Sequence, residues 1–325
     1  MTPQPEREDR PVILLSEPGR LPGDDDVVAL AQRHGRVVER FDAVHMPSED
    51  VLDRVEFLVP PLPHRFGPVT RDVLERTPAL RTIQLLSAGT DHMAGLVRPG
   101  ITLCSAAGVR DPGVAELALG LVLAAQRDLP MHADRMAHGA WERDHLSPGL
   151  HGKRVLIVGH GRIALEIGRH LAPFDIACTR VARTARDDQT GHVHAVSELD
   201  GLLPAADVLI LILPLTSESK GLIDAAMLAQ LPDGALVVNV GRGAVVDTAA
   251  LLSEVRAGRL RAALDVIDPE PLPEEHPLRD LPGAIVTPHV GGNTPYGRVR
   301  EADLLQQQLE RHLTGRPLEN VVPAT

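Results

Sequence analysis

Short apolar runs alternate along the chain with longer segments in which apolar residues recur at helical spacing. In the first hundred residues the runs lie at 12–15, 55–59 and 82–86, and two of the helical segments lie at 27–34 and 70–76. Strands that alternate with helices in this way form βαβ units around a parallel sheet. The pattern predicts a first α/β domain that ends near Leu103.

A second series of buried-strand patterns begins at Arg154. Its runs lie at 155–159, 176–179, 208–214, 235–240, 262–266 and 284–288. Helical segments separate most of them, which predicts a second doubly wound domain around a parallel sheet. An apolar segment at 112–127 predicts a helix that is buried between layers. A polar helix is predicted at roughly 297–312.

Composition and charge argue against some classes of binding partner. The net charge is −11, without a block of basic residues, and aromatic residues make up only 2%. Nucleic acids and anionic membranes are therefore poor partners. Two cysteines, Cys104 and Cys178, offer neither a metal cluster nor a disulfide framework, so no metal is expected. The chain starts with a polar segment and has no run of 18 apolar residues, which favours the cytoplasm.

One segment has the spacing of a dinucleotide-binding turn. A strand pattern runs into a helix pattern through Gly159, Gly161 and Ala164, which stand at G-x-G-x-x-A positions. Gly159 allows a tight turn, and Gly161 lets the backbone approach a pyrophosphate at the helix N-terminus. The turn predicts dinucleotide binding, and the alternative is a purely structural turn.

The residues after the second strand of this domain bear on the choice of cofactor. Where an acidic residue would bind the ribose 2′-OH of NAD, the chain has Ala182, followed by Arg183, Thr184 and Arg186. Guanidinium groups bind a 2′-phosphate well. NADP is therefore favoured over NAD, unless these arginines are solvated and either cofactor serves.

Three successive strand patterns end in residues that can carry a reaction: Arg242, Glu270 and His289. The carboxyl ends of parallel strands meet at one edge of a sheet, where ligands bind. Arg242 could hold a substrate carboxylate and polarise its carbonyl, and His289 could transfer the proton. Glu270 could orient the imidazole and favour its protonated form. Each could alone be a solvated residue, but together they predict interconversion of a 2-keto and a 2-hydroxy acid.

Several separated motifs carry a resemblance to a known family. They are L-L-S-A-G-T-D-H-M, G-V-A-E-L-A-L-G-L-V-L-A-A-Q-R, V-G-H-G-R-I-A, L-P-L-T-S-E-S-K-G-L-I, N-V-G-R-G-A-V-V-D, D-V-I-D-P-E-P-L-P and T-P-H-V-G-G-N-T. From about Arg81 to Val322 the chain resembles the D-2-hydroxyacid dehydrogenase family, which includes glyoxylate/hydroxypyruvate reductases and 3-phosphoglycerate dehydrogenases. Three positions depart from the family pattern: Ala164 and Gly241 by small changes, and Ala182 by the loss of the acidic residue.

The resemblance implies a Rossmann-type cofactor domain, residues 104–293, inserted into a flavodoxin-like substrate domain, residues 1–103 and 294–325. It implies that Arg242, Glu270 and His289 are catalytic, and that the members form homodimers. The substrate carboxylate would be bound by Arg242 and by Ser87, Ala88 and Gly89. Cofactor contacts are expected from Gly159, Gly161, Arg162, Ile163, Arg183, Thr184, Arg186, Pro214, Thr216, Val240, Gly241, Asp265 and Gly291.

Two other functions stay open at this point. One is a dinucleotide-sensing binding protein of the corepressor type, because such proteins share the fold and the three catalytic residues. The other is oxidation of formate or phosphite on the same scaffold.

Overall fold

The computed structural model describes residues 10–16, 23–42 and 44–323, which form two compact units. Unit 1 comprises Met1–Arg110 and Asn293–Thr325, and unit 2 comprises Asp111–Gly292. Each unit is built on a mainly parallel sheet with helices on both faces, which confirms the predicted α/β fold class. The polar start at 1–9 lies outside the described residues.

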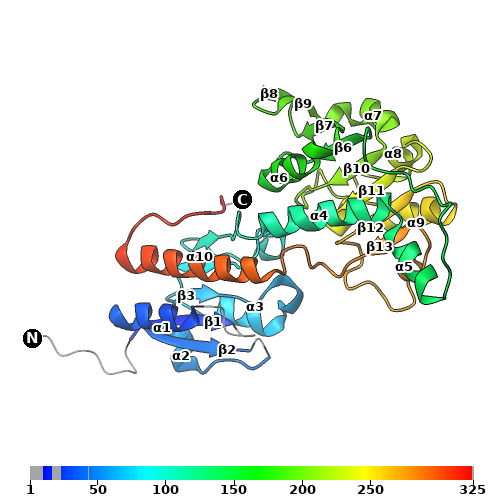
Figure 1. Ribbon diagram of the computed structural model, residues 1–325. Helices are drawn as coiled ribbons and strands as arrows, with labels where there is room; N and C mark the ends of the chain where they lie inside the picture. Colours follow the sequence, from blue (N-terminus) through cyan, green and yellow to red (C-terminus); the bar gives the residue numbers. More distant parts are fainter. Residues whose placement is uncertain (1–9, 17–22, 43, 324–325) are drawn as a thin grey trace, which may run out of the picture. The chain divides into compact units, whose positions relative to one another are not determined.

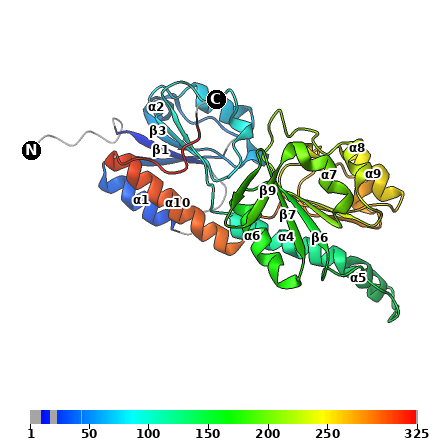
Figure 2. The ribbon, with the colours of Figure 1, turned by 90° about the horizontal axis from the view of Figure 1, so that it is seen from above.

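Unit 1 has five parallel strands in the order β2-β1-β3-β4-β5, the order of flavodoxin-like sheets. The strands are β1 (Val12–Ser16), β2 (Val37–Phe41), β3 (Val55–Val59), β4 (Thr82–Gln84) and β5 (Thr102–Cys104). The helices are α1 (Asp24–Arg33), α2 (Glu49–Arg54), α3 (Pro68–Glu75) and α10 (Pro295–Thr314). Helices α1 and α10 lie side by side, so the two ends of the sequence share one face of this sheet (Figures 1 and 2).

Successive side chains of β1 point to opposite faces of the sheet, and each face has its own apolar core. Val12 and Leu14 belong to the apolar cluster that includes residues of α2 and α3. Ile13 and Leu15 belong to the cluster that includes residues of α1 and α10. All four are buried, as expected for a strand covered by helices on both sides.

Unit 2 has eight strands in the order β13-β12-β11-β10-β6-β7-β9-β8, and β8 alone pairs antiparallel, with β9. They are β6 (Arg154–Val158), β7 (Ala177–Ala182), β8 (Arg186–Asp188), β9 (Gly191–Ala195), β10 (Val208–Leu211), β11 (Leu236–Asn239), β12 (Arg261–Leu264) and β13 (Ala284–Val286). The strand order reverses between β6 and β10, and ligands of doubly wound sheets bind at the carboxyl ends of strands beside such a point.

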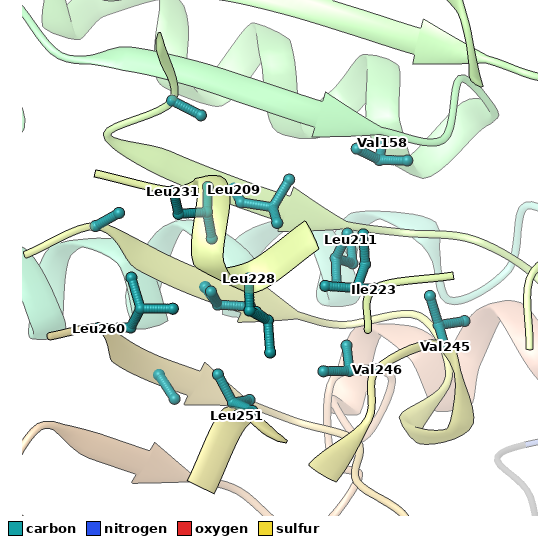
Figure 3. Close-up of a cluster of buried hydrophobic side chains, with 14 of the residues drawn as sticks. Val158, Leu209, Leu211, Ile223, Leu228, Leu231, Val245, Val246, Leu251 and Leu260 are labelled. Atoms are coloured by element: carbon teal, nitrogen blue, oxygen red, sulfur yellow. The ribbon is translucent and has the colours of Figure 1, made fainter. Parts of the chain in front are cut away.

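Helices cover both faces of this sheet. They are α4 (Asp111–Gln126), α5 (Leu129–Ala137), α6 (Arg162–Leu171), α7 (Leu199–Leu202), α8 (Ala225–Gln230) and α9 (Thr248–Arg256). Val155 and Ile157 of β6 belong to the cluster with α4 and α6, whereas Val158 belongs to the opposite cluster with α8 and α9 (Figure 3). No helix in the described part of the chain is long and apolar enough to cross a membrane.

Some expectations need correction. Helix α4 buries one side, including Ala115, Ala118 and Val122, but Leu119 and Leu123 remain partly exposed, so it is not enclosed on all sides. The pattern of apolar runs did not indicate β2, β5, β8, β9, α2 or α5. These elements are short, edge-lying or polar, so they show little apolar periodicity.

Candidate active site

The glycine turn begins where β6 ends. Gly159 has φ +114°, and a Cβ atom there would lie 2.4 Å from the carbonyl oxygen of Ile212, just after β10. Only glycine fits at this position, because it combines a left-handed backbone with close contact between two strand ends. Ala164, one turn into α6, is buried in the core beneath the sheet. The predicted strand, turn and helix are therefore all present.

The N-terminus of α6 is open toward solvent. The helix begins at Arg162, and no side chain caps it at Gly161. A Cβ atom added at Gly161 would meet no heavy atom within 4 Å. The first N–H groups of a helix have no partner within the helix, and this end is electropositive. The turn therefore fits the pyrophosphate of a dinucleotide.

The two arginines after β7 differ in their surroundings. Nε of Arg186 lies 3.9 Å from Oδ2 of Asp188, and the same oxygen bonds to Nε2 of His160 at 2.8 Å. Hydrogen bonds from Thr190, and then from His160, hold the pKa of Asp188 well below its ordinary value. Arg183 is exposed, and among the described residues it has no ion-pair partner. His160 and Asp188 were not among the residues expected at the site, because their pairing depends on the β8–β9 hairpin.

Glu270 and His289 are in direct contact. Glu270 follows β12, and His289 follows the neighbouring parallel strand β13. Nδ1 of His289 lies 2.7 Å from Oε1 of Glu270. Their side chains are 46% and 40% exposed, respectively, so a small molecule can reach them. The structure thus brings together the two residues that the motifs predicted as an acid–base pair.

Asp265 holds the loop that carries His289. The residue is 3% exposed, and its carboxylate accepts hydrogen bonds from the Thr287 hydroxyl at 2.7 Å, from the Val290 N–H at 2.8 Å and from the Gly291 N–H at 2.9 Å. The His289 N–H donates to the Asp265 carbonyl at 2.8 Å. The family resemblance implied a cofactor contact for Asp265, but it did not indicate this positioning role.

Arg242 lies in a turn that Asn239 fixes. The buried Asn239 side chain donates to the Arg242 carbonyl at 3.0 Å and accepts from the Gly241 N–H at 3.1 Å. A Cβ atom on Gly243 would lie 2.1 Å from the carbonyl of Ile267, so this turn packs against the segment after β12. The guanidinium of Arg242 donates to the Gly241 carbonyl at 2.8 Å. Arg242 thus shares an edge of the sheet with Glu270 and His289.

The other expected cofactor contacts follow strands of the same sheet. Pro214 and Thr216 lie in the loop that follows β10. The Ser219 hydroxyl stabilises this loop by donating a hydrogen bond to the Pro214 carbonyl at 2.7 Å. Val240 and Gly241 follow β11, and Gly291 follows His289. All of them lie after carboxyl strand ends, where a dinucleotide would pass.

The expected carboxylate-binding loop belongs to unit 1. The Ser87 hydroxyl donates to the Gly89 carbonyl at 2.8 Å, which fixes a turn after β4. Among the described residues, the N–H groups of Ala88 and Gly89 donate to no acceptor. These amides are therefore available to an anion.

Comparisons with known proteins identify relatives of this chain. Residues 119–291, more than half of the chain and all within unit 2, match the family model described as D-isomer specific 2-hydroxyacid dehydrogenase, NAD binding domain. A glyoxylate/hydroxypyruvate reductase B from Pectobacterium carotovorum is 33% identical over 92% of this chain and 94% of its own length. A D-3-phosphoglycerate dehydrogenase from Methanocaldococcus jannaschii is 28% identical over 95% of this chain, which spans only 59% of that longer relative.

A solved structure shows a similar arrangement over nearly the whole chain. It is the NADPH-dependent glyoxylate/hydroxypyruvate reductase from Sinorhizobium meliloti in complex with NADP and malonate. Its TM-score is 0.78 at 28% sequence identity, over 97% of each chain.

Proposed function

The chain belongs to the D-isomer specific 2-hydroxyacid dehydrogenase family of oxidoreductases, and from that premise we propose that it reduces a small 2-keto acid with NADPH. The observation that carries this proposal is the bond between Glu270 and His289, at the sheet edge that also bears the open glycine turn. An imidazole held by a carboxylate is a good proton donor at this edge, which a substrate can reach.

In the proposed reaction, NADPH supplies the hydride when bound. Arg242 and the free amides of Ala88 and Gly89 bind the substrate carboxylate, and Arg242 polarises the keto group. Because Nδ1 of His289 faces Glu270, Nε2 is the nitrogen left to donate a proton to the keto oxygen. The product is a 2-hydroxy acid, and in the opposite direction neutral His289 accepts the hydroxyl proton.

The proposed preference for NADP rests on Arg183. A carboxylate at position 182 would repel a 2′-phosphate, but the chain has alanine there and a free guanidinium next to it. Arg186 contributes less to this preference, because Asp188 lies close to it. The Sinorhizobium meliloti reductase, which binds NADP, supports the same choice.

The proposed substrate class is glyoxylate and hydroxypyruvate, because the Pectobacterium carotovorum and Sinorhizobium meliloti relatives carry those names. Both compounds combine a carboxylate with an adjacent carbonyl, which suits Arg242 and His289 at one sheet edge.

We also propose a homodimer in the cytoplasm. Large apolar side chains are exposed within a short stretch of unit 2: Leu129, Met136, Trp141 and Leu146, at 54%, 55%, 73% and 91%. Such a cluster is typical of an interface between subunits. Cys104 and Cys178 are free thiols, which suits a reducing compartment.

The test is a panel of 2-keto acids with NADPH and with NADH, followed at 340 nm. The proposal predicts rapid oxidation of NADPH with glyoxylate or hydroxypyruvate and slower oxidation of NADH. Absence of turnover with every acid, together with tight dinucleotide binding, would favour a dinucleotide-sensing binding protein. NADP reduction with formate or phosphite, but no reaction with keto acids, would favour oxidation of those anions.

A further inference from the structure

The hairpin β8–β9, at the edge of the unit 2 sheet, brings two histidines together. His192 and His194 stand two residues apart on β9, so their side chains share the face opposite the buried Val193. Their ring centroids are 4.5 Å apart, with the rings nearly perpendicular at 88°. The expected catalytic and cofactor-binding residues do not include either histidine.

Two carboxylates complete this group. Nδ1 of His194 lies 2.9 Å from Oε2 of Glu198, and Nδ1 of His192 lies 2.8 Å from Oδ1 of Asp187 on the facing strand. The other oxygen of Glu198 accepts the Ala195 N–H at 2.8 Å, which fixes the carboxylate.

This group differs from ordinary surface ion pairs because three potential ligand atoms lie close to one another. One ligand atom from each of His192, His194 and Glu198 lies within 4.8 Å of the other two. In the described part of the chain, no other three histidine, cysteine, aspartate or glutamate residues meet in this way. A bound ion would replace the proton between His194 and Glu198 and draw the three atoms slightly closer.

The donor set selects a class of metal. Two imidazoles and one carboxylate suit zinc and its neighbours in the first transition series, whereas magnesium and calcium prefer oxygen ligands alone. Asp187, which accepts from Nδ1 of His192, would orient Nε2 of that ring toward the ion, as carboxylates beside metal-bound histidines do.

We propose that His192, His194 and Glu198 form a binding site for a divalent transition-metal ion of the zinc class, with Asp187 orienting His192. The ion joins β9 to the turn at Val196–Glu198 that follows it. The sequence suggested no metal because its cysteines offered no cluster, and this hairpin was not predicted. The site is separate from the proposed hydride-transfer residues, so its test does not depend on activity.

The test is calorimetric titration of the chelator-treated full-length chain with Zn²⁺ alone. The proposal predicts saturable binding of one ion per chain with micromolar affinity. His192→Gln and His194→Gln should each weaken it by about tenfold or more, and Glu198→Gln should also weaken it. His132→Gln is the matched control, because His132 and His145 form another surface pair, with centroids 5.3 Å apart, that does not converge with a third ligand.

A second measurement needs no variant. Bound Zn²⁺ should slow modification of His192 and His194 by diethyl pyrocarbonate, read by peptide mass spectrometry, and leave His132 and His145 unprotected. Equal modification with and without Zn²⁺ would overturn the proposal. Titration heats without saturation, or binding that folded His194→Gln protein retains in full, would overturn it as well.

Discussion

Nδ1 of His289 lies 2.7 Å from Oε1 of Glu270, although the two residues follow different strands of the unit 2 sheet. The bond occupies Nδ1 and leaves Nε2 as the ring nitrogen that can reach a substrate. It also places a negative charge beside the ring that must carry the proton. The first prediction separates that charge from the hydrogen bond.

Glu270→Gln keeps an oxygen that can accept from His289 but removes the charge. We expect kcat for glyoxylate reduction with NADPH to fall by about 10- to 100-fold, because the protonated imidazole loses its stabilising partner. Glu275→Gln, an exposed carboxylate on the same segment, is the matched control and should leave kcat unchanged. Equal rates in both variants would remove Glu270 from the mechanism.

Arg183→Ala should weaken the binding of NADPH by about tenfold or more while changing NADH binding little, because a charged hydrogen bond to the 2′-phosphate is lost. Arg186→Ala should have a smaller effect, since Asp188 already lies 3.9 Å from its guanidinium. Dissociation constants from cofactor fluorescence give the comparison. Equal losses for the two cofactors would contradict the assignment of Arg183.

Asp265→Asn replaces one carboxylate oxygen by an amide NH₂, which cannot accept: either the two bonds that Thr287 and Val290 donate to Oδ1 or the bond that Gly291 donates to Oδ2 is lost. A buried donor left without an acceptor costs about 1 to 3 kcal/mol, so the free energy of unfolding should fall by that amount. Because the same loop carries His289, kcat should fall too. Urea unfolding and steady-state kinetics measure the two effects, and unchanged values for both would show that the loop does not depend on this carboxylate.

Glu56 makes the free energy of unfolding depend on pH. Burial alone would raise its pKa, but the nearby His312 imidazole and the hydrogen-bonded Arg36 guanidinium outweigh burial and lower it from 4.5 to about 2. The folded chain therefore gains stability from ionised Glu56 above pH 4.5 and loses it as the pH falls toward 2. Glu56→Gln should remove of the order of 2 kcal/mol of the fall in unfolding free energy between pH 6 and pH 3. A variant with the same pH profile as the wild type would contradict this.

The buried strands could be predicted from the sequence, whereas the strands at the edge of the sheet could not. Runs such as 155–159 and 235–240 are apolar because β6 and β11 are buried on both faces, so their hydrophobicity marks them directly. In β9, by contrast, Val193 alone is fully buried, and β8 is exposed throughout, so neither has a pattern to detect. Helix α5 buries no residue.

Some features of the candidate site could likewise be predicted from the sequence, and others could not. Motifs placed Glu270 and His289 after neighbouring strands, and parallel topology then brings them together. The roles of Asp265 and Asn239 could not be predicted, because they depend on which backbone groups face a buried side chain. The pairing of His160 with Asp188 depends on the fold of the hairpin, so the difference between Arg183 and Arg186 could not be predicted either.

The central claim is that His289 delivers the proton as hydride reaches the keto carbon. The most direct measurement is single-turnover oxidation of enzyme-bound NADPH by glyoxylate at 340 nm, in the wild type and in His289→Asn. Asparagine suits the left-handed backbone at this position, φ +53°, so the loop should stay intact. The account predicts a rate lower by about two to four orders of magnitude with NADPH binding nearly unchanged. Equal single-turnover rates in the two proteins would contradict it.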